Sequence, residues 1–105
     1  MTRELLELAA RAMGPDRVVW HTELGLWLSK DTRLDWNPAT SQADSADLRD
    51  ALEIDVQYNK LSVYATTGHD DGCNSTVNYN GTPEDRSRAV REAVLAVAAE
   101  IGRAK

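Results

Sequence analysis

Apolar and polar positions alternate along this chain with two different periods, which divides it into predicted helices and strands. A helix is expected at residues 3–13, where apolar side chains recur every three or four positions between Thr2, a suitable cap, and the stop signal Gly14-Pro15. A second, short and acidic helix is expected at about 44–52, with Ser41 or Asp44 as its cap.

The last predicted helix has the strongest signals. Thr82 is its expected cap, Pro83 occupies the first helical position, and Asp85 follows three residues after the cap, which is nearly a capping box. A stripe at helical spacing follows, formed by Val90, Ala93, Val94, Val97 and Ile101. Gly102 lies near the end of this helix.

Strand-like alternation marks three further segments. Residues 17–30 predict either one bent strand or a hairpin that turns near residues 23–25. Residues 54–65 predict a hairpin with one apolar face, whose tight turn at Asn59-Lys60 is expected to be type I′ because asparagine tolerates positive φ. Residues 76–80 predict a third strand, with Val77 and Tyr79 directed inward.

The predicted order is helix, one or two strands, helix, three strands, helix. It indicates an α+β fold in which an antiparallel sheet of about four to five strands is packed with three helices. A chain of 105 residues is expected to form a single α/β sandwich domain.

Composition narrows the class of protein. No apolar run is long enough to span a membrane, and the charged N-terminal segment does not resemble a secretory signal, so a cytoplasmic location is expected. The net charge of −5 argues against direct binding of nucleic acid. Residues 37–85 contain nine of the 17 acidic side chains and two of the 12 basic ones, so the charge is concentrated in the middle of the chain.

Motifs that would indicate catalysis or metal binding are weak. In the loop at 67–75, the side chains of His69, Asp70, Asp71 and Cys73, joined by His21, are possible metal ligands, but their spacing matches no zinc or calcium signature. Cys73 and His69 lie in a loop, which is a poor setting for a nucleophile and its base. We therefore expect neither a cofactor nor an enzyme, with a small metal-dependent enzyme as an alternative.

Two sets of residues are candidates for binding a partner. The first is an acidic series that spans the second helix and the next strand, and it is either a solvated face or an imitation of spaced phosphates. It consists of Asp44, Asp47, Asp50, Glu53 and Asp55. The second set is apolar: Trp20 and Trp27 fall on opposite sides of a regular strand, which exposes one of them, and Leu95 lies off the helical stripe. Leu95 either serves a homodimer or is buried by a second layer of helices.

Two segments together resemble small phage and prophage proteins of the ABA-sandwich type. They are "WNPATSQADSADLRDALEIDV", with its Trp36-Asn37-Pro38 turn, and "EDRSRAVREAVLAVAAEIG". The resemblance implies an α/β sandwich of phage origin and implies no activity. The turn itself is interpreted as a structural corner with Trp36 as a buried anchor, or alternatively as part of a partner surface.

These observations predict a non-catalytic phage or prophage accessory protein in the host cytoplasm. It would bind a host or phage protein, for example to inhibit a host defence system or a host enzyme, without contacting nucleic acid or membrane directly. The competing hypotheses are an inhibitor that imitates nucleic acid through its acidic face and the small metal-dependent enzyme.

Overall fold

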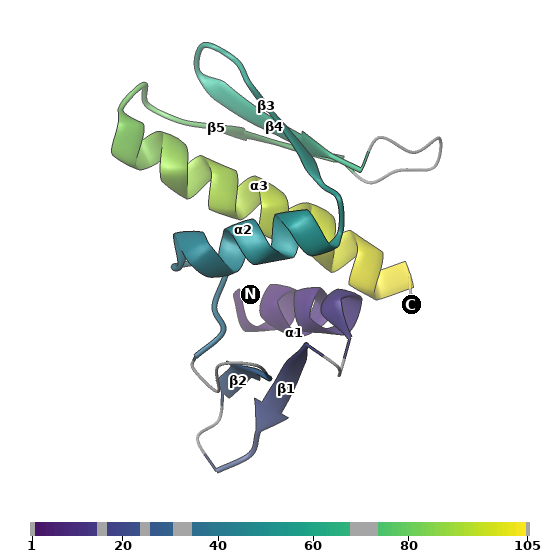
Figure 1. Ribbon diagram of the computed structural model, residues 1–105. Helices are drawn as coiled ribbons and strands as arrows, with labels where there is room; N and C mark the ends of the chain where they lie inside the picture. Colours follow the sequence, from purple (N-terminus) through teal and green to yellow (C-terminus); the bar gives the residue numbers. More distant parts are fainter. Residues whose placement is uncertain (1, 15–16, 24–25, 31–34, 68–73, 105) are drawn as a thin grey trace.

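The computed structural model of the chain describes residues 2–14, 17–23, 26–30, 35–67 and 74–104 (Figure 1). Its elements follow the predicted order, which confirms the α+β class. In sequence they are α1 (Thr2–Met13), β1 (Val18–His21), β2 (Leu26–Ser29), α2 (Gln42–Ala51), β3 (Asp55–Tyr58), β4 (Ser62–Thr66), β5 (Asn74–Asn78) and α3 (Pro83–Ala104). None of the helices in these ranges has the length and apolar character needed to cross a membrane.

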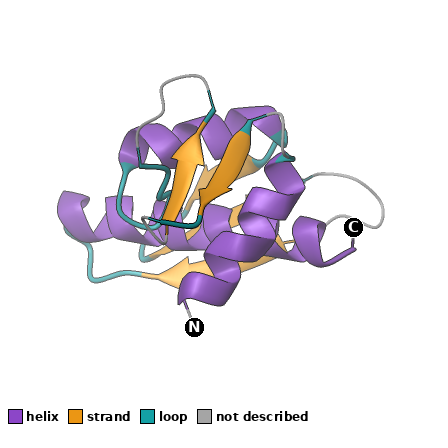
Figure 2. Cartoon of the chain, turned by 90° about the horizontal axis from the view of Figure 1, so that it is seen from below, coloured by secondary structure: helices purple, strands orange, loops and turns teal. Residues whose placement is uncertain are grey.

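The strands form two separate antiparallel sheets, whereas the sequence suggested one. Strands β1 and β2 form a hairpin, and β3, β4 and β5 form a three-stranded sheet in that order. Helix α1 and helix α2 lie between the two sheets, so the edges of the sheets do not meet (Figure 1). In Figure 2, which views the molecule from below, the hairpin lies in front of the helices.

Helix α3 is the centre of the core. One face of the three-stranded sheet covers it, with Val63 and Ala65 of β4 completely buried, and α1 and α2 pack against it as well. The predicted stripe is confirmed at Ala93, Val94 and Val97, all of which are completely buried. The radius of gyration, 13.3 Å, is what a single domain of about 100 residues has.

Helices α1 and α3 approach each other unusually closely at Gly102. A Cβ atom at this position would lie 1.8 Å from the carbonyl oxygen of Leu8, so only glycine fits. Ala9 and Ala12 of α1 are also buried, which keeps side chains small on the facing helix. Helix α1 already includes Thr2, which was expected to precede it as the cap.

The turn between β3 and β4 differs from the predicted one. The Asn59 N–H donates to the Ser62 carbonyl at 2.9 Å, which places Lys60 and Leu61 at the tip. Among the described non-glycine residues only Glu53 has a positive φ, so the type I′ turn was wrong. Tyr58 lies on the predicted apolar face but at its margin, where it is exposed. Strand β5 begins two residues earlier than expected, at Asn74.

The Trp36-Asn37-Pro38 segment forms the structural corner that the sequence predicted. Trp36 is 3% exposed, Pro38 is fully buried, and the Trp36 N–H donates to the Trp27 carbonyl at 2.9 Å. The Asn37 N–H donates to the Asp44 carboxylate at 2.8 Å, and Ser41 caps α2 by accepting from the Asp44 N–H at 3.2 Å. The corner thus fixes where α2 begins.

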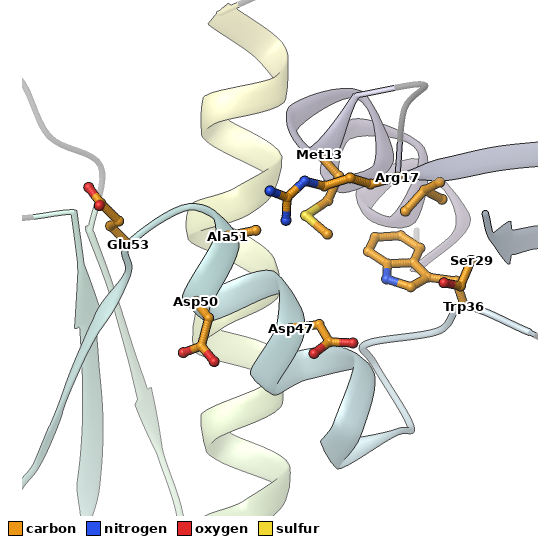
Figure 3. Close-up of a pocket in the computed structure, with 9 residues that line it drawn as sticks. Met13, Arg17, Ser29, Trp36, Asp47, Asp50, Ala51 and Glu53 are labelled. Atoms are coloured by element: carbon orange, nitrogen blue, oxygen red, sulfur yellow. The ribbon is translucent and has the colours of Figure 1, made fainter. Parts of the chain in front are cut away.

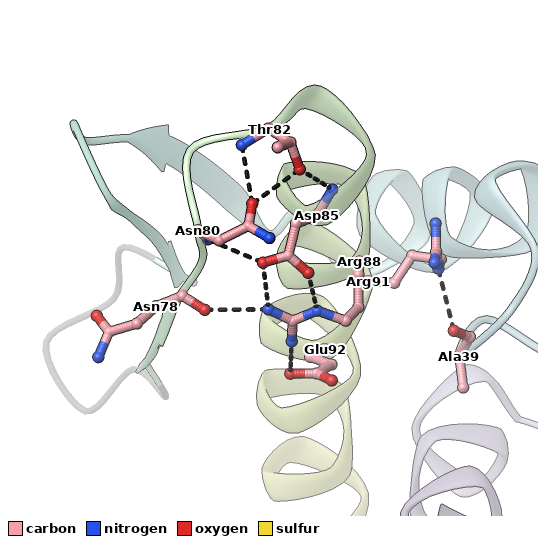
Figure 4. A network of polar contacts seen from close by, with 8 residues as sticks. All are labelled: Ala39, Asn78, Asn80, Thr82, Asp85, Arg88, Arg91 and Glu92. Carbon is pink, nitrogen blue, oxygen red and sulfur yellow. Dashed lines mark hydrogen bonds and ion pairs between the residues drawn. The ribbon is translucent and has the colours of Figure 1, made fainter.

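A polar network joins the end of β5 to the first turns of α3 (Figure 4). Arg88 donates to the Asp85 carboxylate at 2.6 Å and to the Asn78 carbonyl at 3.1 Å. The Asn80 N–H donates to the same carboxylate at 2.9 Å. The Arg88 hydrogen bond, followed by the Asn80 N–H, lowers the pKa of Asp85 to about 2, and the same ion pair raises the pKa of Arg88.

Candidate functional site: an acidic cleft beside α2

A cleft of about 430 Å³ opens between α2, the end of α1 and the β1–β2 hairpin (Figure 3). Its walls combine acidic residues from α2 and from the turn after it with an arginine, an indole and apolar side chains. The lining residues are Met13, Arg17, Val18, Ser29, Trp36, Asp47, Asp50, Ala51 and Glu53. A volume in this range is typical of ligand sites in proteins.

Three acidic residues line the α2 side of the cleft, and Figure 3 shows the carboxylates of Asp50 and Glu53 directed outward, away from Trp36. Asp47 and Asp50 are three residues apart on α2, which places them on neighbouring positions of one helix face. All three acidic side chains, including Glu53, are exposed. Within the described residues their only ion-pair contact is a distant one, 4.0 Å between Asp50 and Arg49. These carboxylates are therefore available to a ligand.

The backbone at Glu53 is strained. Its φ of 54° lies in the left-handed region, just after the end of α2, where glycine or asparagine is the usual residue. A side chain with a Cβ costs roughly 1 kcal/mol in this conformation. The turn thus places an acidic residue at the rim of the cleft, at a position where glycine would be more stable.

The indole of Trp36 contributes a buried donor without an acceptor. Its Nε1–H has no hydrogen-bond partner in the described parts of the chain, and an indole nitrogen is a donor only. Figure 3 shows this nitrogen on the side of the ring nearer to α2. An unpaired buried donor costs about 1–3 kcal/mol, so an acceptor reaching this atom would be favoured. Arg17 extends toward α2 from the other wall (Figure 3).

The structure brings together three of the five predicted acidic residues. Asp47, Asp50 and Glu53 line the cleft, but the Asp44 carboxylate accepts the Asn37 N–H and is committed to the corner. Asp55 pairs with Thr66 in the three-stranded sheet, is exposed and does not line the cleft. The predicted series is therefore not one uninterrupted binding surface.

The two tryptophans lie on the same face of the hairpin, contrary to the expectation for a regular strand. The hairpin register sets Trp20 directly opposite Trp27, and their rings meet edge to face with centroids 5.2 Å apart. The reversal between β1 and β2 changes the side on which Trp27 points. Trp20 remains 39% exposed, whereas Trp27 packs partly against the core.

Leu95 is 3% exposed and belongs to the core around α3. Of the two possibilities that the sequence left open, burial by a second layer of helices is therefore the one found. Leu95 offers no surface for a homodimer in this fold.

The predicted metal ligands in the loop, His69, Asp70, Asp71 and Cys73, lie outside the described residues. Within the described ranges, no group of three or more histidine, cysteine, aspartate or glutamate side chains is arranged to hold a metal ion.

Sequence reasoning missed Arg17 and the role of the Trp36 nitrogen. No local signal identifies them, because the end of α1 meets α2 only in the folded chain. Comparison of the chain with protein-family models, curated proteins and solved structures gives no match.

Proposed function

We propose that this protein is a non-catalytic binding protein that holds a basic segment of a partner protein in the acidic cleft. The observation that carries the proposal is that one hollow is lined by three exposed acidic residues and by Trp36, whose buried indole N–H has no partner among the described residues. Carboxylates alone would be a solvated surface. The unpaired donor adds a hydrogen-bonding requirement that an acceptor on a partner can meet.

A basic peptide has the groups that this cleft requires. Its lysine or arginine side chains pair with Asp47, Asp50 and Glu53, which are three acidic residues against one arginine, Arg17, among the described residues that line the cleft. Its backbone carbonyl groups are acceptors for the Trp36 Nε1–H and for the Arg17 guanidinium. A small rotation of a lining side chain is needed for a carbonyl to reach the indole nitrogen, since that atom is buried.

The class of partner is a prediction that rests on the resemblance to phage ABA-sandwich proteins. On that basis we propose a phage or prophage origin, a host or phage protein as partner, and inhibition of a host defence system or enzyme as the outcome. Trp20, half-exposed on the hairpin beside the cleft residue Val18, is a second contact candidate because tryptophan is enriched at binding hot spots.

The test uses a fluorescent peptide of alternating arginine and glycine as the probe and follows its anisotropy with the intact chain. Each of Asp47→Asn, Asp50→Asn and Glu53→Gln is expected to weaken binding roughly two- to fivefold, the value of an exposed ion pair. In a ¹H–¹⁵N spectrum the Trp36 indole signal, assigned by elimination with Trp20→Phe and Trp27→Phe, is expected to move downfield on binding.

Asp55→Asn is the matched control, because it removes the same charge from an exposed carboxylate outside the cleft. It should leave the affinity nearly unchanged. An equal loss with Asp55→Asn would instead favour an extended acidic surface that imitates nucleic acid. Absence of saturable binding, or an unmoved Trp36 signal, would refute the cleft as the site.

A further inference from the structure

A second hollow lies against another face of α2, and its charge is opposite to that of the acidic cleft. It has a volume of about 300 Å³ and is bordered by α2, the first turns of α3 and the end of β3. Two arginines, two serines and a tyrosine contribute most of its polar groups. The lining residues are Gln42, Ser45, Ala46, Arg49, Tyr58, Arg86, Ser87 and Val90.

The pocket arginines, Arg49 of α2 and Arg86 of α3, have fewer side-chain partners than the arginines farther along α3. Arg88 is bound by two carboxylates, Arg103 is paired with Glu100, and Arg91 donates to the Ala39 carbonyl and to Gln42. Arg86, by contrast, has no ion pair or side-chain hydrogen bond with the described residues. Within the described part of the chain, the one ion-pair contact of Arg49 is that of 4.0 Å with Asp50, whose side chain is 79% exposed. The pocket is therefore lined by two arginines whose guanidinium donors are largely unused by the described residues.

Tyr58 orients the guanidinium group of Arg86 through a cation–π contact. The Arg86 guanidinium lies over the Tyr58 ring, 5.4 Å from its centroid. A cation–π contact uses the flat face of the guanidinium and leaves the N–H donors along its edge free. This fork of donors matches the oxygens of a phosphate group. The contact thus orders Arg86 without consuming its hydrogen-bonding capacity.

We propose that this pocket binds a small phosphate monoester, with Arg49 and Arg86 as the groups that hold the phosphate. Ser87 and Tyr58 line the same space, and their hydroxyl groups are suitable further donors. The volume exceeds what a phosphate ion alone occupies, so an organic portion is accommodated. The acidic neighbours offset this charge only in part: Asp85 is paired with Arg88, Glu84 is exposed, and Asp50, 4.0 Å from Arg49, has a side chain that is 79% exposed and therefore screened by solvent.

The test is a titration of the intact chain with ribose 5-phosphate, with inorganic phosphate and with ribose, followed by ¹H–¹⁵N spectra and calorimetry. Saturable binding of the two phosphates at millimolar concentration or below is expected, with shifts at the residues of the pocket. Ribose, which lacks the phosphate, should not bind. Arg49→Gln and Arg86→Gln should each weaken binding about tenfold, as expected for a hydrogen bond to a charged group.

Arg103→Gln is the matched control, because it removes one positive charge from α3 away from the pocket. It should leave the affinity within twofold of the unchanged chain, roughly the effect expected for a remote, screened charge. Equal weakening by Arg103→Gln would show non-specific attraction and overturn the site. Failure of both phosphates to bind would overturn it as well, and so would binding of ribose alone.

Discussion

The two sheets of this protein are attached to the helices in different ways. The three-stranded sheet β3–β4–β5 lies directly on α3, buries Val63 and Ala65 completely, and is joined to the helix by the network around Asp85 and Arg88. The β1–β2 hairpin meets the core through α1 and the Trp36 corner. It leaves Val19 and Trp20 more than one-third exposed.

This difference separates stability from binding in space. The sheet on α3 supplies buried apolar area, which is the main favourable contribution to folding. The hairpin contributes less to the core, and it borders the acidic cleft. A region with few buried contacts can change its local conformation at low cost in free energy, and a binding site for a partner segment needs this property.

The largest effect is expected from Gly102→Ala, which acts on the α1–α3 contact that links the hairpin to the core. An exposed glycine in a helix normally gains about 0.5–1 kcal/mol of stability on this change. Here the new Cβ would lie 1.8 Å from the Leu8 carbonyl oxygen, so the helices must separate. We expect the free energy of unfolding to fall by about 3 kcal/mol, measured by urea denaturation.

Hydrogen exchange in the same variant sharpens the comparison. Amides of α1 and of β1–β2 should exchange faster than before, and those of β3–β5 should change less. Gly14→Ala is the control: its φ is +92° but nothing lies within 4 Å, so only backbone strain of about 1 kcal/mol is expected. A stabilised Gly102→Ala variant would contradict the close contact.

A matched pair of valines compares the sheets directly. Val63 of β4 is 0% exposed and Val19 of β1 is 37% exposed. Val63→Ala should reduce the free energy of unfolding by about 2 kcal/mol, because it removes two buried methyl groups and leaves a cavity. Val19→Ala should change it by about 0.5 kcal/mol or less. Equal losses in thermal or urea unfolding would show that the hairpin is as much a part of the core as the sheet.

The smallest effect is on the pH dependence of stability, and it concerns the Asp85–Arg88 network that joins the three-stranded sheet to α3. Because the pKa of Asp85 is lowered from 3.8 to about 2 in the folded state, its contribution to stability is present above about pH 4 and is lost as the pH falls toward 2. Asp85→Asn should therefore flatten the decline of stability in that window, measured by urea unfolding at several pH values. The same flattening in Glu84→Gln would show that general charge at the helix end, and not the Arg88 pair, is responsible.

Much of the fold could be predicted from the sequence because its signals are local. The stripe of α3, the Ser41 cap, the alternation of β3 and β4 and the Trp36 corner depend on neighbours within a few residues. The turn at Lys60-Leu61 was misplaced by one residue, since the Asn59-Lys60 pair suits a type I′ turn that the chain does not adopt. The candidate site was only partly predicted: Asp47, Asp50 and Glu53 were identified, while Arg17 was not.

The sequence by itself determined which segments are helical or extended and which face of each is apolar, because backbone preference and side-chain periodicity act over one or two turns. Only the tertiary structure decided that the strands divide into two sheets, that Leu95 is buried and that Trp20 meets Trp27. It also brought an arginine, a tryptophan and three acidic residues to the lining of one cleft, and two arginines to the lining of another pocket. These outcomes depend on how closely α1, α2 and α3 approach one another, and that distance is set by contacts such as Gly102 with Leu8, between residues far apart in the chain.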